Sequence, residues 1–543
     1  MRNIAPLRRE TGVNPWIALT VLNLGLFMVS LDVTIVNVAI PQLADGINAS
    51  LDQAAWVTNA YVLALAVLLV TTGRLGDIFG PKPVFLAGTA VFTTASAVCG
   101  MVDTPSALIG ARALQGVGAA LLTPQPLTIV TGLFPPERRG SAFAVNGIVG
   151  GLGTLAGPLA GGLLVTHLSW RWVFYANVPV GALAIAATLY LVPDLRTGRR
   201  HRLDVKGVTL ASVGLLAVTF GITEGQRYAW GRVWSFVTIP LILLLGALLL
   251  AVFGWQQART QRREPLLLFT LFRDRDFALM IGVGLGLQFV FIGYLLPFAI
   301  YLQSVLGMSP LQAGLVTAPS AVANIVASPV LGRIVDRRGA RGVLICGLLA
   351  FATGIAMLIG NAGVGQSRWA FIPAMLVIGL GISATFSPMI TKAMAAIPQQ
   401  HAGAASGMLN TSRQLGAVLG GGLIAAVLQN RLASALRDQA VARTAGLPAG
   451  VRAELVAAFT GASRGGLQIG AGQSGAKLPA LPASLAAEAR RLSGQVYQHA
   501  YVAALFPTLL LCVGVLAVTV LCALAAHRDR LPAEQGIEAT QLS

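Results

Sequence analysis

Charged residues and cysteines are scarce in this chain of 543 residues, and both scarcities restrict what it can be. Only 11% of the residues are Asp, Glu, Lys or Arg, whereas about 25% is usual for a soluble domain. The four cysteines fall in apolar stretches, and their spacing fits neither metal ligation nor a disulfide framework. We interpret each of them as a small apolar residue in helix packing. They are Cys99, Cys346, Cys512 and Cys522.

Motifs for covalent or ATP-driven chemistry are also missing. The chain has no Gly-x-x-x-x-Gly-Lys-Ser/Thr phosphate-binding loop, which excludes an ATP motor of that type. We find no nucleophile–base arrangement and no metal-ligand cluster, so we predict a protein that is not an enzyme, with no catalytic residues, no metal and no cofactor. Energy must come from a gradient or from downhill flow. One charge crossing about 100 mV provides about 2.3 kcal/mol, enough for roughly a 50-fold substrate gradient.

Long apolar runs make up most of the sequence. Hydrophobic residues are 55% of the chain, and the mean hydropathy is +0.74. A helix needs about 20 mainly apolar residues to cross a bilayer, and backbone within lipid must satisfy its own hydrogen bonds. The sequence therefore predicts an all-α membrane protein with 14 transmembrane helices. The predicted spans are 16–40, 54–73, 84–101, 106–131, 141–166, 173–192, 205–223, 234–255, 277–302, 311–332, 342–360, 369–391, 403–428 and 502–526.

The distribution of basic residues predicts the orientation. An even number of spans places both termini on one side, where the segments hold 24 Lys and Arg, against 4 in the short loops opposite. The positive-inside rule then makes both termini cytoplasmic. The first apolar run is too long for a cleavable signal. Since Ala, Gly and Arg richness fits a high-GC bacterium, we expect a multi-pass protein of the bacterial inner (plasma) membrane.

The net charge of +18 raises the question of a nucleic-acid partner. The basic residues cluster next to predicted spans, as in 199–202, 262–263 and 337–338. Topology and contact with anionic membrane lipid explain such clusters, so we predict no nucleic-acid partner. The sequence gives no indication of an accessory periplasmic partner.

A repeated phrase divides the chain into related halves. Residues 73–82 and 332–341 share Gly, Arg, Asp, Gly and a final basic residue at identical offsets, 259 residues apart. A shifted repeat of this kind indicates a duplicated transporter. Because span 2 matches span 10, spans 7 and 8 form an insert and the arrangement is 6 + 2 + 6. The predicted units are a six-helix bundle in 1–200, two inserted helices in 201–265 and a second six-helix bundle in 266–543.

The second bundle contains a long predicted extracytoplasmic loop, at about 429–500. It has amphipathic stretches at 430–442, 449–462 and 484–497 around a Gly-rich middle. A surface loop with short helices and a gating segment that admits substrate are both compatible with this pattern.

One acidic residue, Asp32, lies well inside a predicted span. A carboxylate at bilayer depth costs about 2.5–3.5 kcal/mol on insertion scales, so it should face a cavity or a partner. Asp32 can then take up a proton, attract a cationic substrate, or only hydrogen-bond a neighbouring helix. Arg112 in span 4 also needs acceptors there. It can respond to the charge of the proton site or hold helices together.

Span 5 is rich in glycine and contains Pro158, a pattern typical of close helix packing with a kink. Arg413 occupies the comparable region of span 13 beside Asn410, and a pore-lining role is predicted for both. Asn37 and Gln115 are further candidates for cavity lining. The glycines singled out in span 5 are Gly153, Gly157, Gly161 and Gly162.

The two repeated phrases predict a charge cluster at the cytoplasmic ends of the helices. A carboxylate near a helix N-terminus is stabilised by the helix dipole, and basic neighbours add to the cluster. Such a cluster can hold one conformation and release it in another. We define these residues as the cytoplasmic latch: Gly73, Asp77, Gly80, Lys82, Asp336 and Arg337.

These phrases together resemble the major facilitator superfamily over nearly the whole chain. The repeated phrases resemble its Gly-x-x-x-Asp-x-x-Gly-basic motif, and the Arg112 phrase resembles its span-4 motif. Residues 153–162 resemble the span-5 motif of antiporters. Residues 31–37 and 170–181 look like hallmarks of the fourteen-span drug:proton antiporters, the EmrB/QacA type.

The resemblance implies two six-helix bundles that rock about a central site and exchange outward export for inward protons. By that similarity Asp32 is the proton and cation site, Arg112 its coupling partner, and the span-5 helix a seal that favours export. Ile78 and Pro81 stand where the family usually has basic residues, while Lys82 remains, so the first half of the latch is either weaker or relies on Arg74.

The leading hypothesis is a proton-coupled antiporter that exports lipophilic, often cationic drugs or toxic compounds. The alternative is a dedicated exporter of one metabolite, lipid, siderophore or self-made antibiotic, which the single acidic membrane residue slightly favours. A transporter-derived sensor is disfavoured by the complete motif set, and import by the antiporter-like Gly157–Pro158 segment.

Overall fold

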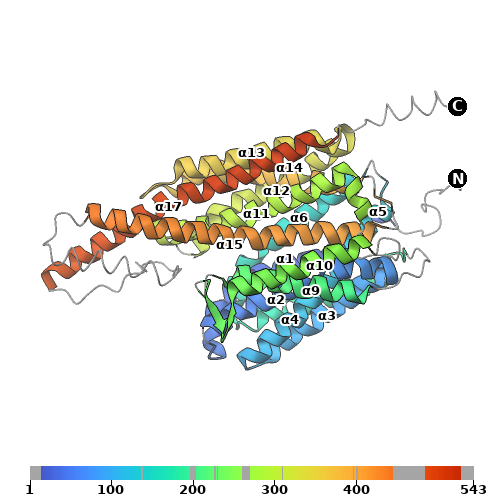
Figure 1. Cartoon of the computed structure of the whole chain (residues 1–543), viewed down its shortest axis with the longest axis horizontal. Coiled ribbons are helices and arrows are strands. Elements are labelled where there is room, and N and C mark those ends of the chain that lie inside the picture. Colours follow the sequence, from blue (N-terminus) through green and yellow to red (C-terminus); the bar gives the residue numbers. More distant parts are fainter. Residues whose placement is uncertain are drawn as a thin grey trace.

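A computed structural model describes residues 14–49, 51–135, 138–195, 204–225, 228, 230–259, 269–308, 310–395, 397–398, 401–443 and 483–527, and this part of the chain is almost entirely helical (Figure 1). The elements before residue 200 are α1 (Pro15–Gly46), α2 (Leu51–Phe79), α3 (Pro81–Met101), α4 (Pro105–Leu122), α5 (Gln125–Leu133), α6 (Arg139–His167), α7 (Trp172–Tyr175) and α8 (Asn177–Leu191). Next come α9 (Val205–Glu224), β1 (Arg232–Trp234), β2 (Val237–Thr238) and α10 (Ile239–Arg259). The remaining elements are η3 (Phe269–Arg273), α11 (Arg275–Ile300), η4 (Tyr301–Val305), α12 (Pro310–Arg338), α13 (Ala340–Asn361), η5 (Arg368–Phe371), α14 (Ile372–Met394), α15 (Ala402–Arg443) and α17 (Ala483–Ala525).

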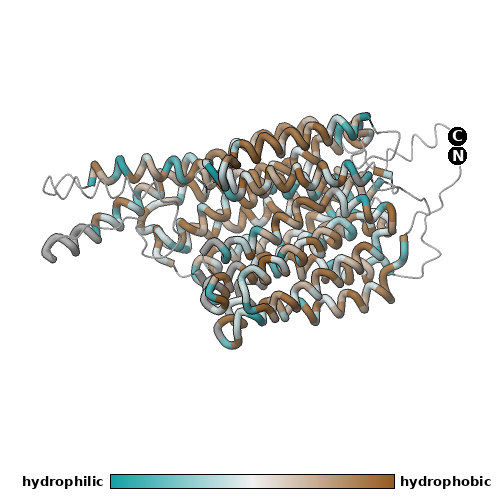
Figure 2. Tube along the Cα trace, turned by 60° about the horizontal axis from the view of Figure 1, so that its bottom comes forward, coloured by the Kyte–Doolittle hydropathy of each residue, from teal (hydrophilic) through white to brown (hydrophobic). Residues whose placement is uncertain are grey.

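The prediction of a polytopic helical membrane protein agrees with the length and composition of these helices. Among the described residues, 11 helices are long and apolar enough to cross a membrane, or 12 if the bent pair Trp56–Leu69 and Thr71–Phe79 is one span. The predicted spans 141–166 and 205–223 correspond to α6 and to the shorter apolar helix Lys206–Ile222. The count of 14 therefore stays a prediction. Hydrophobic positions dominate the body of the bundle (Figure 2).

The repeated phrases form equivalent turns in the two halves. Gly80 separates α2 from α3 with a φ of 92°, and Gly339 separates α12 from α13 with a φ of 87°. Residues with a side chain rarely adopt this backbone region, whereas glycine does so at little cost. The second glycine of the phrase is therefore required by the sharp turn between two antiparallel helices.

The prediction that span 8 begins at residue 234 is wrong. Residues of β1 and β2 form a small antiparallel hairpin, in which Arg232 pairs with Thr238, and α10 begins only at Ile239. The segment from Arg232 to Thr238 is rich in β-branched and aromatic residues, which favour a strand over a helix.

The predicted loop at 429–500 is also corrected at its two ends. Helix α15 continues to Arg443 and α17 begins at Ala483, so the stretches 430–442 and 484–497 prolong membrane helices instead of forming separate ones. A 42-residue helix is about 63 Å long, far more than a bilayer requires, and both helices protrude from one end of the bundle (Figure 1). Leu428, Leu432 and Leu436 are buried at helical spacing along this extension. The stretch 449–462 lies outside the described residues.

Contacts between segments far apart in the sequence bring the two halves together. Helix α6 packs against α12 and α14, while α2 packs against α15. Helices α9 and α10 pack on each other, and α9 also contacts α2 and α15. The division into bundles at 1–200 and 266–543 with a two-helix insert is compatible with these contacts and stays a prediction.

Candidate functional site

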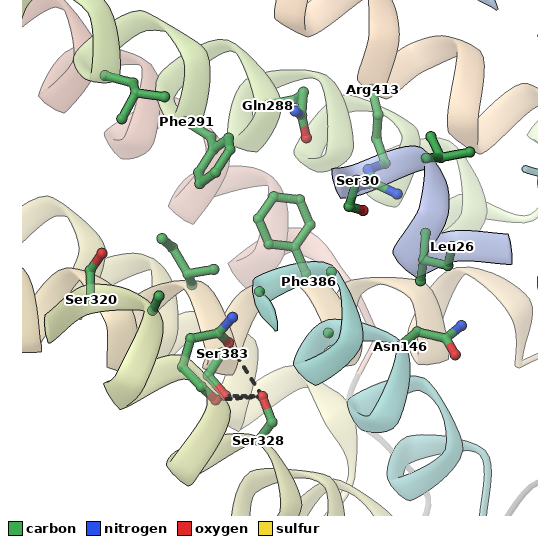
Figure 3. Close-up of a pocket in the computed structure, with 18 of the residues that line it drawn as sticks. Leu26, Ser30, Asn146, Gln288, Phe291, Ser320, Ser328, Ser383, Phe386 and Arg413 are labelled. Atoms are coloured by element: carbon green, nitrogen blue, oxygen red, sulfur yellow. Dashed lines mark hydrogen bonds between the residues drawn. The ribbon is translucent and has the colours of Figure 1, made fainter. Parts of the chain in front are cut away.

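A cavity of about 1300 Å³ lies between helices of the two halves (Figure 3). Ser30 and Asn146 line it from α1 and α6, and Gln288 and Phe386 line it from α11 and α14. The predicted lining residues Asn410 and Arg413 belong to its wall, as does Gly162. The wall is mostly apolar with a few polar groups, as is usual for a site that binds small molecules. The side chain of Asn37 lies outside the described part of the structure.

Asp32 lies on the opposite face of α1 from this cavity, inside the first bundle. Ser30 lines the cavity, and two residues further along a helix a side chain points roughly the other way. The Asp32 carboxylate is 0% exposed and accepts a charged hydrogen bond from Arg112 Nη1 at 2.7 Å. Gln115 Nε2 donates to it at 2.9 Å and Asn177 Nδ2 at 3.0 Å. Asp32 is therefore a fully satisfied buried carboxylate in this conformation.

The side chain of Arg112 is only 1% exposed, and its guanidinium has several partners within the protein. Its Nε donates to the carbonyl of Val57 at 3.1 Å, and Nη1 also donates to Gln115 Oε1 at 2.7 Å. Its centre lies 4.3 Å from the ring centroid of Tyr61, which adds a cation–π contact. The prediction that Gln115 lines the cavity is corrected, because the structure places it within this ion pair.

Asn177 and Ser96 belong to this network, although neither was predicted from the sequence as a site residue. The Asn177 amide bridges Asp32 and Ser96 Oγ, the second contact measuring 3.2 Å. Helix α8 begins at Asn177 after a break at Ala176, which places this polar side chain inside the bundle. Its position in the phrase 170–181 was the available signal, because an asparagine in an apolar span needs a partner.

The glycines of the span-5 motif have two different surroundings: some lie against α1, and Gly162 faces the cavity. A Cβ on Gly157 would lie 2.0 Å from Thr34 Oγ1, and one on Gly153 would lie 2.7 Å from Ser30 Cβ. These two glycines therefore allow α6 to approach α1 closely. Gly162 has nothing within 4 Å of such a Cβ and faces the cavity. Gly161 is buried, and the side chain of Pro158 lies outside the described part of the structure.

In the first half of the latch, Asp77 joins α2 to the start of α15. Its carboxylate accepts hydrogen bonds from the backbone N–H groups of Gly403 and Ala404, both at 2.9 Å. This places a negative charge at the positive end of the helix dipole. Arg74 Nη1 lies 3.7 Å from Asp77, whereas Lys82 Nζ donates to the carbonyl of Leu189.

The second half of the latch repeats this arrangement between α12 and α6. The Asp336 carboxylate accepts from the backbone N–H of Ser141 at 3.1 Å and from its hydroxyl. Each aspartate of the repeat thus binds the first turn of a helix from the other half. Arg337 is exposed. Gly73 lies where the halves touch, because a Cβ there would be 2.6 Å from the carbonyl oxygen of Gly403.

Replacing Asp77 by Asn should impair transport while the protein still inserts into the membrane. The change removes the charge at the start of α15, a loss of about 1 kcal/mol, which changes the ratio of two conformations about fivefold. Transport rates at equal expression measure this. The control is Asp438→Asn, which alters an exposed aspartate in α15, the helix whose start Asp77 binds. Rates that match the wild type would disprove the role of Asp77 in the latch.

Both the sequence and the fold are similar to those of known membrane transporters. The Major Facilitator Superfamily profile matches residues 22–421. The chain is 34% identical over 429 residues to the tetracenomycin C resistance and export protein of Streptomyces glaucescens, covering 78% of each chain. It is also 34% identical to the multidrug resistance protein Stp of Mycobacterium tuberculosis, over 76% of each chain. The crystal structure of the human organic anion transporter MFSD10 superposes with a TM-score of 0.58 at 14% identity, covering 94% of this chain and 99% of that one, a likeness of fold alone.

Proposed function

Since this chain belongs to the major facilitator superfamily, we propose that it is a proton-coupled antiporter that exports lipophilic drugs or toxic compounds by alternating access. It is a transporter and not an enzyme, needs no cofactor, and is driven by the proton gradient. Its partners are the small substrate, protons and membrane lipid. It crosses the bacterial inner membrane with 14 helices arranged 6 + 2 + 6, and both termini are cytoplasmic.

The observation that carries this proposal is the position of α1 between two sites. One face of α1 presents Asp32 to Arg112, and another presents Leu26 and Ser30 to the cavity. On the same helix, Ser30 and Thr34 are in close contact with the glycines of α6. A movement of α1 caused by a rearrangement around Asp32 therefore also shifts the residues of α1 that line the cavity.

Protonation of Asp32 is the step that would move this helix. A proton on the carboxylate removes the negative charge that Arg112 faces at 2.7 Å, and a buried arginine without a counter-charge is costly. Arg112 then has to find other acceptors, and the packing of α1 against α6, α8 and α2 changes. The two latch aspartates hold the cytoplasmic ends of the bundles together in the conformation described here.

A second candidate function is the dedicated export of one compound, such as a self-made antibiotic. The relative from Streptomyces glaucescens, named for resistance to and export of tetracenomycin C, favours it. Breadth of substrate separates the two functions, because a dedicated exporter moves one compound of a panel and a multidrug exporter moves several.

The test is substrate-induced release of a proton gradient in everted membrane vesicles. We expect a panel that contains cationic, neutral and acidic lipophilic compounds to include several that dissipate the gradient only when the protein is present. Vesicles with a protonophore, and vesicles without the protein, are the controls. If no member of the panel dissipates the gradient, proton-coupled export of lipophilic compounds is wrong.

A further inference from the structure

The charge of the cavity wall is opposite to what a cation-binding site requires. Of the described residues that line it, three carry ionisable groups: Arg413 and His167, which are bases, and the phenol Tyr294. None of these lining residues is Asp or Glu, and Asp32 is not among them. In a low-dielectric cavity, one fixed positive charge acts strongly on any charged ligand.

Arg413 differs from Arg112 in having no hydrogen-bond acceptor among the residues that the structure describes. Arg112 is bonded to a carboxylate, an amide oxygen and a backbone carbonyl. The structure gives Arg413 no hydrogen-bond or salt-bridge partner among the described residues, and its buried Nε is unsatisfied. Burial of an unpaired cation is expensive, so such residues within a membrane usually mark a ligand pathway.

One aromatic ring, that of Phe386, lies against the guanidinium of Arg413, and two further rings extend from it. The centre of the guanidinium lies 5.1 Å from the ring centroid of Phe386. Phe386 meets Phe291 edge to face, with centroids 6.2 Å apart, and Tyr294 lies 6.4 Å beyond Phe291. Figure 3 shows Arg413 and Gln288 pointing into the cavity on one side of this pair of phenylalanines. The buried Oε1 of Gln288 has no partner among the described residues either.

We propose that this cavity binds acidic aromatic compounds, in place of the cationic drugs predicted from the sequence. A planar ring system packs against Phe386 and Phe291, and its carboxylate or phenolate accepts charged hydrogen bonds from Arg413. Gln288 Oε1 accepts a hydrogen bond from a hydroxyl of the same compound. The proposal rests on the proposed function, because it names the substrate class of that exporter.

Two dyes that share a xanthene ring but differ in charge provide the test. Fluorescein is an anion at pH 8 and rhodamine 123 is a cation, so charge is the main difference between them. Binding to the purified full chain in detergent is measured by fluorescence polarisation, with protein-free micelles as the blank. The variants are Arg413→Gln, Arg413→Lys and, as a matched control, Arg368→Gln, which alters an exposed arginine outside the cavity.

We expect the wild type to bind fluorescein about tenfold or more tightly than rhodamine 123, the effect of one charged hydrogen-bonded pair. Arg413→Gln should lose this preference, Arg413→Lys should keep part of it, and Arg368→Gln should bind like the wild type. Tighter binding of rhodamine 123 by the wild type, or unchanged fluorescein binding in a monodisperse Arg413→Gln variant, would overturn the proposal.

The ligand class and the exporter function can be tested separately, because binding in detergent needs no proton gradient. If fluorescein binds through Arg413 but vesicles with the protein move neither dye, the exporter function is wrong and the ligand class stands. If vesicles export rhodamine 123 and the protein does not bind fluorescein, export stands and the ligand class is wrong.

Discussion

Replacing Asp32 by Asn is expected to abolish proton-driven export, leaving only the background rate of cells without the protein. The asparagine keeps the shape of the side chain but cannot exchange a proton, and it leaves Arg112 buried without its counter-charge. Breaking a buried ion pair from one side also costs about 3–5 kcal/mol of stability. Export from energised cells and thermal unfolding of the purified protein measure the two effects.

A double variant separates coupling from stability. Asp32→Asn combined with Arg112→Gln removes both charges, so the melting temperature should recover much of its loss while export stays abolished. Asp103→Asn is the matched control, because Asp103 also pairs with an arginine, Arg171, but at an exposed position. If Asp32→Asn exports at the rate of Asp103→Asn, proton coupling lies elsewhere.

Replacing Gly157 by Ala should have the second largest effect, on both stability and transport. The new Cβ would lie 2.0 Å from Thr34 Oγ1 and 2.6 Å from Thr34 Cβ, so α6 and α1 must move apart. Overpacking of this kind costs about 1–3 kcal/mol, and it separates α6 from the helix that carries Asp32. We expect a melting temperature lower by a few degrees and a loss of most export activity.

The partner of this contact provides a rescue. Thr34→Gly removes the two nearest atoms that the alanine would meet and leaves the backbone nitrogen of Ile35 at 3.0 Å, so the double variant with Gly157→Ala should recover part of the lost stability. Gly514→Ala in α17 is the control, because nothing lies within 4 Å of a Cβ at that position. Equal behaviour of Gly157→Ala and Gly514→Ala would show that close packing of α1 and α6 has no role.

Local features of the fold could be predicted from the sequence because short segments of sequence determine them. The repeated phrase indicated equivalent positions in the two halves, and its second glycine proved to be the residue with positive φ in both. The ends of α15 and α17 were not predicted, because amphipathic stretches beside a long loop look alike whether they continue a helix or form a new one. Whether such a stretch continues the helix depends on tertiary contacts. Leu432 is buried, and α15 packs against α17.

The surroundings of the candidate site also depend on tertiary contacts, which could not be predicted from the sequence. Asp32, Arg112 and Arg413 could be selected from the sequence, since ionisable residues in apolar spans are rare and costly. Their surroundings could not, because Asn177 meets Asp32 across 145 residues of chain. The face of α1 on which Asp32 lies also depends on packing. The sequence therefore predicted a substrate beside Asp32, whereas the structure places the cavity beside Arg413.

Proton-coupled export through Asp32 can be measured with the purified full chain in proteoliposomes. With an imposed pH gradient and no ATP, we expect an exported compound to accumulate against its own gradient. This accumulation should be abolished by nigericin and absent with Asp32→Asn. Accumulation that persists after the pH gradient is collapsed, or that is unchanged by Asp32→Asn, would contradict a proton-coupled exporter that uses Asp32.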